Sequence, residues 1–110
     1  MSKLVDNAGD LAKILKEKES VFVLIYASWC PHSARFLPIF EKHADNKARS
    51  CARLVINDDE TVAEKYKVEY YPTVLLFKKG KVVKRLDSLH GEGLDEDQLK
   101  DFFSACGKDE

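Results

Sequence analysis

The chain has 110 residues, of which 45% are hydrophobic and 34% charged, so it can form one domain with a buried core. Its 18 basic and 19 acidic side chains leave a formal net charge of -1, which gives no electrostatic reason to expect nucleic acid or an anionic membrane as a partner. The first ten residues lack the apolar stretch of a secretory signal, and the longest apolar run, residues 21–27, is too short to span a bilayer.

The first half of the chain predicts a helix, a buried strand and a second helix, in that order. Apolar residues recur at helical spacing within residues 6–20. Residues 20–28 are apolar, β-branched and aromatic without alternation, which indicates a central strand covered on both faces. Residues 30–45 place apolar side chains on one broad helix face. Pro31 suits the first turn of that helix, and Pro38 predicts a kink within it.

The second half predicts a strand, a short helix, a hairpin and a closing helix. Residues 51–57 read as a strand, and residues 58–68 as a short helix with an acidic start. Residues 72–88 form two apolar runs joined by a Lys-Gly turn, which indicates a β-hairpin. Residues 95–107 begin with acids, place apolar side chains on one face and end at a glycine, as amphipathic helices do.

This order of elements predicts an α/β fold with a single domain over residues 1–110. Strands separated by helices pair in parallel through right-handed crossovers, and the hairpin adds antiparallel strands. With a candidate first strand at residues 3–5, the expected architecture is a mixed sheet of four to five strands flanked by four helices.

Cys30 is the residue most suited to chemistry. It stands between the most buried strand and the start of the next helix, where the helix dipole stabilises a negative charge and so the reactive thiolate. His32, when protonated, would add positive charge in the same turn, and Trp29 would supply an apolar wall. Many free cysteines are simply small buried hydrophobic residues, but this position favours a reactive thiol.

Three segments, IYASWCPHS, YPTVLLFKKGKVV and DQLKDFF, resemble the thioredoxin family over nearly the whole chain. The resemblance implies the thioredoxin fold, thiol–disulfide oxidoreductase activity, and Cys30 as the attacking cysteine. It also implies that Pro72 is the cis-proline whose loop packs against Cys30 and presents backbone groups to a substrate. The residues expected to bind substrate are therefore Trp29, Pro31, Tyr71 and Pro72.

Two positions depart from the family pattern. Ser33 stands where the family has its second, resolving cysteine, and Leu24 stands where thioredoxins carry a buried aspartate. The Pro-His pair resembles the Cys-Pro-His-Cys motif of oxidising relatives, in which the histidine stabilises the thiolate. Cys30 can still form a mixed disulfide, but a hydroxyl at position 33 cannot release the partner. Ser33 is either natural or an introduced replacement of cysteine, and both readings stay open.

The predicted function is that of a monothiol thiol–disulfide oxidoreductase in the cytoplasm. Its expected partners are protein disulfides or oxidised protein thiols, with glutathione or a thioredoxin reductase as the electron donor and no cofactor or metal. We expect a monomer that can form a Cys30-linked dimer. One alternative is a redox-inactive binding or adaptor module. Another is a glutathione-dependent monothiol enzyme, which the absence of a Gly-Gly motif after Pro72 disfavours.

The remaining cysteines and histidines have no expected role in chemistry. Three widely spaced cysteines predict neither a disulfide framework nor a zinc site, and they favour a reducing compartment. Cys51 is predicted to lie in the core, and Cys106 to be partly exposed. His43 and His90 are predicted to be surface residues, because neither has a nearby pattern of metal ligands.

Overall fold

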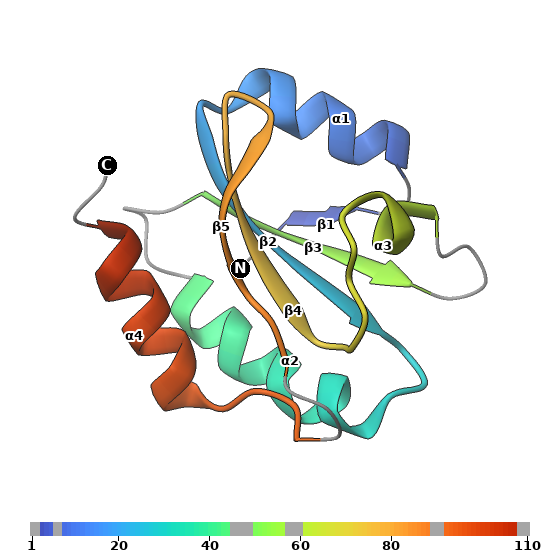
Figure 1. The fold of residues 1–110 in the computed structure, drawn as a ribbon, viewed down its shortest axis with the longest axis vertical. Helices are drawn as coiled ribbons and strands as arrows, with labels where there is room; N and C mark the ends of the chain where they lie inside the picture. Colours follow the sequence, from blue (N-terminus) through green and yellow to red (C-terminus); the bar gives the residue numbers. More distant parts are fainter. Residues whose placement is uncertain (1–2, 6–7, 45–49, 57–60, 89–91, 108–110) are drawn as a thin grey trace.

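The computed structural model describes residues 3–5, 8–44, 50–56, 61–88 and 92–107. Within them the chain forms one mixed sheet with helices on both faces, which confirms the predicted thioredoxin fold (Figure 1). No helix in this part of the chain is long and apolar enough to cross a membrane. The elements in chain order are β1 (Lys3–Val5), α1 (Ala8–Glu17), β2 (Ser20–Ala27), α2 (Pro31–Ala44), β3 (Cys51–Ile56), α3 (Thr61–Lys65), β4 (Thr73–Lys78), β5 (Lys81–Leu86) and α4 (Glu96–Gly107). The predicted acidic start of α3 lies outside the described residues.

The sheet has the strand order β1-β3-β2-β4-β5, so β2 lies at its centre. Strands β1, β3 and β2 run parallel, whereas β4 is antiparallel to β2, and β5 is antiparallel to β4. Strand β2 is buried along its length except at Ser20, as a central strand covered by helices must be. Its carboxyl end leads directly into α2, and this junction carries Cys30.

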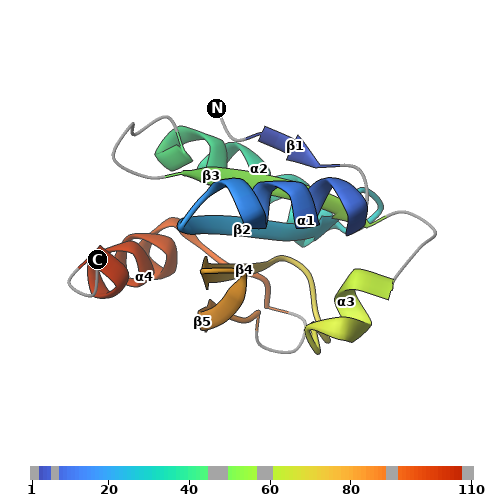
Figure 2. The same cartoon turned by 90° about the horizontal axis from the view of Figure 1, so that it is seen from above.

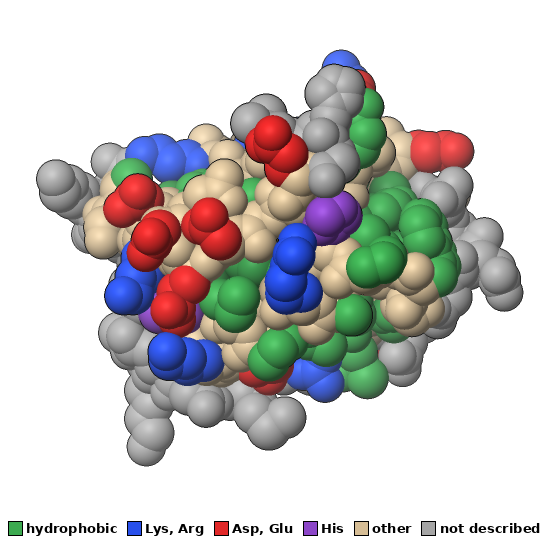
Figure 3. Space-filling model, turned by 90° about the horizontal axis from the view of Figure 1, so that it is seen from below, with side chains coloured by type: hydrophobic (Ala, Val, Ile, Leu, Met, Phe, Trp, Pro, Cys, Tyr) green, Lys and Arg blue, Asp and Glu red, His purple; other side chains and the backbone are tan. Residues whose placement is uncertain are grey.

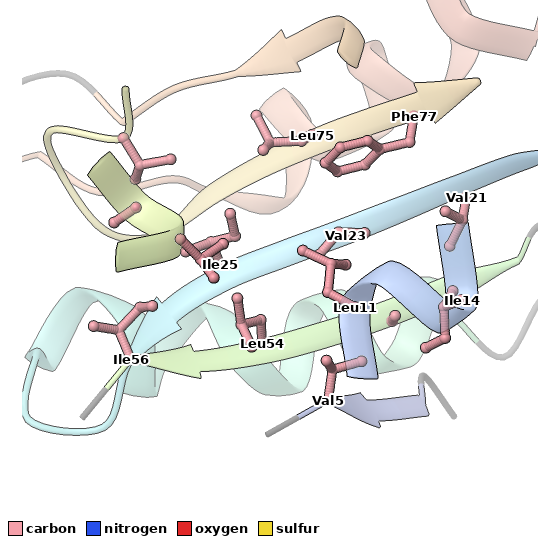
Figure 4. Packing of buried hydrophobic residues seen from close by; sticks show 14 residues of the cluster. Val5, Leu11, Ile14, Val21, Val23, Ile25, Leu54, Ile56, Leu75 and Phe77 are labelled. Carbon is pink, nitrogen blue, oxygen red and sulfur yellow. The ribbon is translucent and has the colours of Figure 1, made fainter. Parts of the chain in front are cut away.

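One face of the sheet is covered by α1 and α3. Because side chains alternate along a strand, every second residue of β2 points to this face. Val21, Val23 and Ile25 pack there with Leu11 and Ile14 of α1 (Figure 4). Figure 2 shows α1 lying across β2 and β3, with the short helix α3 at one end of the sheet. Two helices therefore cover this face, α1 with ten residues and α3 with five.

The opposite face is covered by the longer helices α2 and α4, which lie together below the sheet in Figure 1. Phe22 of β2 meets Phe103 of α4 edge to face, with ring centroids 4.7 Å apart. Leu24, which replaces the aspartate of the family pattern, has no exposed surface and belongs to the same apolar cluster as Phe36 and Phe40 of α2. The ring packing makes this the more aromatic of the two faces.

Helix α4 begins with a capping box. The backbone N–H of Gln98 donates to the Asp95 carboxylate (2.8 Å), and the Asp95 N–H donates to the Gln98 side-chain oxygen (2.9 Å). The acidic residues Asp95 and Glu96 therefore mark the start of a helix, as the sequence predicts.

Polar contacts also join α4 to α2. Glu96 receives hydrogen bonds from His43 (3.0 Å) and Lys42 (3.1 Å). Both lower the pKa of Glu96 from its usual value, and the hydrogen bond from His43 has the larger effect. His43, predicted to be a surface residue, is partly exposed (20% for its side chain) and is also paired with α4 through Glu96. His90 lies outside the described residues.

Candidate active site

Cys30 is the N-cap residue of α2. The chain leaves β2 in a tight turn, in which the Cys30 N–H donates to the carbonyl oxygen of Ala27 (3.2 Å). The Cys30 carbonyl then accepts the first intrahelical hydrogen bond, from the N–H of Ala34 (3.0 Å). Pro31 is the first helical residue, where its missing N–H costs nothing. The sulfur is thus held at the positive end of a 14-residue helix.

The side chain of Cys30 is half-buried and lines a groove of about 370 Å³, which we call the Cys30 groove. Trp29, His32, Tyr71 and Gly93 line it as well. The Cys30 thiol donates a long hydrogen bond to the carbonyl oxygen of Tyr71, with an S···O distance of 3.8 Å. A backbone acceptor therefore lies beside the sulfur, on the loop that precedes β4.

The Tyr71–Pro72 peptide bond is cis, which confirms the prediction from the family resemblance. Pro72 itself is buried, and its carbonyl accepts a hydrogen bond from the hydroxyl of Ser88. Pro31 is exposed, and neither proline lines the Cys30 groove. Of the four residues predicted to bind substrate, Trp29 and Tyr71 therefore line the groove, and the two prolines do not.

Trp29 forms an exposed apolar wall beside Cys30. Its side chain is 63% exposed and meets Tyr71 edge to face, with ring centroids 6.0 Å apart. Tyr70, the next large apolar side chain of the groove, is 41% exposed. Figure 3 shows hydrophobic side chains gathered beside a histidine on this end of the molecule. Exposed aromatic surface next to a thiol is suited to contact with a protein partner.

Ser33 is fully buried and does not line the groove. Its hydroxyl oxygen accepts a hydrogen bond from the backbone N–H of Ala27 (3.2 Å), and this hydrogen bond stabilises the turn between β2 and α2. In the described residues the other buried polar side chains are Thr73 and Ser88, neither of which ionises. No buried carboxylate therefore lies in the described part of the chain, in agreement with Leu24 at the family's aspartate position.

His32 pairs with Arg35, one turn along α2. The Arg35 guanidinium lies 2.7 Å from Nδ1 of His32. A guanidinium has only donors, so Nδ1 is the acceptor in this contact. The guanidinium of Arg35 therefore places a permanent positive charge beside His32, near the start of α2.

Gly93, on the loop before α4, packs directly against His32. A Cβ at Gly93 would lie 2.9 Å from both Cβ and Nδ1 of His32, closer than real contacts allow. The residue also has a φ of +70°, which favours glycine. The loop that carries Gly93 therefore restricts the positions that the His32 imidazole can occupy.

The sequence matches the family described as "Thioredoxin" over residues 4–105. This chain belongs to the thioredoxin family. Among solved structures, the thioredoxin of Fasciola hepatica is 27% identical with a TM-score of 0.80, and the match covers 94% of this chain and 97% of that one. A mutant thioredoxin from Halobacterium salinarum is 26% identical with a TM-score of 0.78, over 94% of this chain and 88% of that one.

The thioredoxin-family relatives with curated names include much longer proteins. Protein disulfide-isomerase A5 of Bos taurus is 32% identical over 89 residues, which cover 76% of this chain and 17% of that protein. Endoplasmic reticulum resident protein 44 of Mus musculus is 30% identical over 87 residues, which cover 72% of this chain and 21% of that protein. The chain thus spans about a fifth or less of these relatives, and it resembles one domain of a disulfide isomerase.

The other two cysteines of this thioredoxin-family chain lie away from the Cys30 groove. Cys106 has no exposed surface, so the prediction of a partly exposed thiol is wrong: it packs in the apolar cluster between α4 and the sheet. Cys51 is half-buried against the same cluster, close to its predicted core position. None of the three cysteines is joined in a disulfide.

Sequence reasoning missed two groups around His32. Arg35 could have been found, because side chains three residues apart on a helix are neighbours. Gly93 could not, because its contact with His32 joins distant segments and follows no local pattern.

Proposed function

We propose that this thioredoxin-family chain is a monothiol thiol–disulfide oxidoreductase, in which Cys30 forms mixed disulfides with partner proteins. The observation that carries the proposal is the position of Cys30 as helix N-cap in a groove, 3.8 Å from the Tyr71 carbonyl. The helix end stabilises the thiolate, and the carbonyl offers a backbone acceptor to an extended partner segment. Trp29 and Tyr71 supply the apolar contacts that would hold the partner.

The proposed reaction stops after its first exchange. The Cys30 thiolate attacks one sulfur of a partner disulfide, a new S–S bond forms, and the other partner sulfur leaves as a thiolate that takes up a proton. In a dithiol site, a second thiolate would then displace the partner. Ser33 has instead a buried hydroxyl that is hydrogen-bonded to the Ala27 N–H, so release of the partner needs a thiol from another molecule. Glutathione, or the first thiol of a thioredoxin reductase, would attack the Cys30 sulfur of the mixed disulfide and release the partner as a thiolate. A second glutathione, or the second thiol of the reductase, would then attack the new disulfide, form oxidised glutathione or the oxidised reductase, and return Cys30 as a thiolate.

We also propose a reducing, cytoplasmic setting, because none of Cys30, Cys51 and Cys106 is joined in a disulfide. We propose a monomer under these conditions. When outside thiols are exhausted, the half-exposed position of Cys30 would allow two chains to be linked through this residue.

A redox-inactive binding module is the second candidate, and the exposure of Trp29 favours it. The two functions differ in what they require of Cys30. In a binding module, Cys30→Ser leaves partner affinity unchanged, whereas in the oxidoreductase it abolishes covalent capture.

The test compares the protein with Ser33→Cys. Each is reduced, freed of small thiols, mixed with insulin and quenched with acid, and the products are read by intact mass spectrometry. With Ser33, the protein–insulin adduct should persist. In Ser33→Cys the new thiolate should attack the adduct, release the insulin chain and leave an internal disulfide between position 33 and Cys30. Recovery should be partial, because Leu24 provides no carboxylate to accept the second thiol's proton.

Cys30→Ser is the control and should give no adduct. If neither the original protein nor Ser33→Cys forms an adduct or reduces insulin, Cys30 has no redox role and the binding-module function replaces the proposal.

A further inference from the structure

A second groove lies on the other side of α3 from Cys30. It has a volume of about 600 Å³, against about 370 Å³ for the Cys30 groove, and it is bounded by α1, α3 and the turn between β4 and β5. Figure 1 shows α1 and this turn together at the upper end of the molecule, with α3 beneath α1. Val62 and Tyr66 line this groove, whereas Ala63 and Glu64 line the other. We call it the lysine groove, after the side chains described below.

The floor of the lysine groove is apolar. Leu11 and Val62 belong to the buried core and contribute to the lining, and Leu15 and Tyr66 form half-buried sides. Tyr66 is held in place edge to face against Phe77 (5.2 Å between ring centroids). A concave apolar surface of this size is the usual form of a small-molecule site, because burying the ligand's apolar part releases water from both surfaces.

The lining is strongly positive. Lys16, Lys18, Lys65 and Lys79 line the groove, and Glu19 is the one acidic side chain among the described residues that line it. All four lysines are exposed, so their stems can cover apolar surface while the ammonium groups stay at the water boundary. This excess of three positive charges lies in a chain whose formal net charge is -1.

The Cys30 groove has the opposite character. Among the described residues, its lining contains Glu64 and Glu69 and no lysine or arginine. A ligand that carries a negative charge on an apolar body is therefore favoured by the lysine groove and disfavoured by its neighbour. This difference in charge between the two grooves indicates an anionic ligand for the lysine groove.

We propose that the lysine groove binds an amphipathic organic anion, with an apolar body against Leu15 and Tyr66 and an anionic group among the lysines. The shared chemistry is a carboxylate, phosphate or sulfonate at one end of a hydrocarbon. The site does not depend on the redox role of Cys30, because α3 separates the two grooves.

The test is a titration followed by amide NMR, with octanoate as the probe. Octanoate should shift signals of Lys16, Lys65, Tyr66 and Gly80 saturably. Octyltrimethylammonium has the same chain with the opposite charge, and butyrate has the same charge on a short chain. Both should bind more weakly. Cys30→Ser should bind octanoate as the original protein does.

Two variants with matched controls locate the site. Replacing Lys16, Lys65 and Lys79 by Gln should weaken octanoate binding by about fivefold or more, since each exposed charge contributes modestly. The control replaces Lys13, Lys81 and Lys100, which are exposed outside the groove. Ala12→Trp should fill the groove and block binding, whereas Ala105→Trp, on the exposed side of α4, should not.

Several results would overturn the proposal. They are shifts that do not saturate, equal binding of octanoate and octyltrimethylammonium, octanoate shifts confined to Trp29 and Tyr71, or equal weakening by the two lysine triples. If Ala12→Trp loses its dispersed amide spectrum, the lysine triple alone decides.

Discussion

The two faces of the sheet are covered to different extents. On the α2/α4 face, long helices carry interlocking aromatic rings, with Phe22 against both Phe102 (5.9 Å) and Phe103 (4.7 Å). On the α1/α3 face, α3 has only five residues, and a groove of about 600 Å³ remains open. The α2/α4 face is thus more fully covered, and the α1/α3 face keeps an open groove beside its short helix.

The well-covered face is also the one that places Cys30. Helix α2 carries the cysteine at its first turn and is tied at its last turn to Glu96 of α4. The loop that leads into α4 contacts His32 through Gly93. The packing of α2 and α4 thus sets the position of the thiol at the helix end.

Removing an aromatic ring from the covered face should have the largest effect on stability. Phe103→Ala, at 2% exposure, should cost about 3–5 kcal/mol, because it leaves a cavity against Phe22. Leu15→Ala, half-buried beside the lysine groove, should cost about 1–2 kcal/mol. Urea denaturation of both variants measures the difference. Equal losses would contradict the contrast between the faces.

Gly93→Ala should have an intermediate effect that reaches the active site. The left-handed backbone alone should cost about 1–2 kcal/mol. Gly80→Ala is the matched control: Gly80 has a φ of +81°, but a Cβ there meets nothing within 4 Å. Gly93→Ala should therefore be less stable than Gly80→Ala in urea, and it alone should shift the His32 ring signals in NMR. Indistinguishable variants would show that the contact with His32 carries no constraint.

The smallest effect should come from Glu96→Gln. Because Glu96 has a lowered pKa in the folded chain, its ionised form stabilises the fold fully above its usual value of 4.5, and this contribution is lost as pH falls through the lowered pKa. The Tm of Glu96→Gln should thus be slightly below that of the original protein at pH 7 and equal to it near pH 2. Asp101→Asn, exposed on the same helix, is the control. A Tm difference that grows on acidification would contradict the assigned pairing.

Much of the fold follows from local sequence patterns. Strand β2 was predictable because it is uniformly apolar, and α4 because acids precede it and apolar residues recur at helical spacing. The same spacing contained a signal for Cys106 that the prediction overlooked: residues 99, 103 and 106 share one helix face, and all are buried.

The parts that were not predictable depend on contacts between distant segments. Glu96 meets His43 across 53 residues, and Gly93 meets His32 from another element, so no local spacing indicates either pair. The lysine groove likewise collects residues from α1, α3 and the β4–β5 turn. Cys30 was predictable as the reactive residue because its position at a strand–helix junction is itself a local pattern.

The most direct test of the central claim is the order in which the three thiols react. Brief alkylation with iodoacetamide at neutral pH, followed by peptide mass spectrometry, should label Cys30 first. Cys51 should react more slowly, and Cys106 only after unfolding, because it has no exposed surface. In denaturant the three should react alike, which serves as the control. Labelling of Cys51 or Cys106 ahead of Cys30 in the folded protein would contradict the assignment of Cys30 as the reactive thiol.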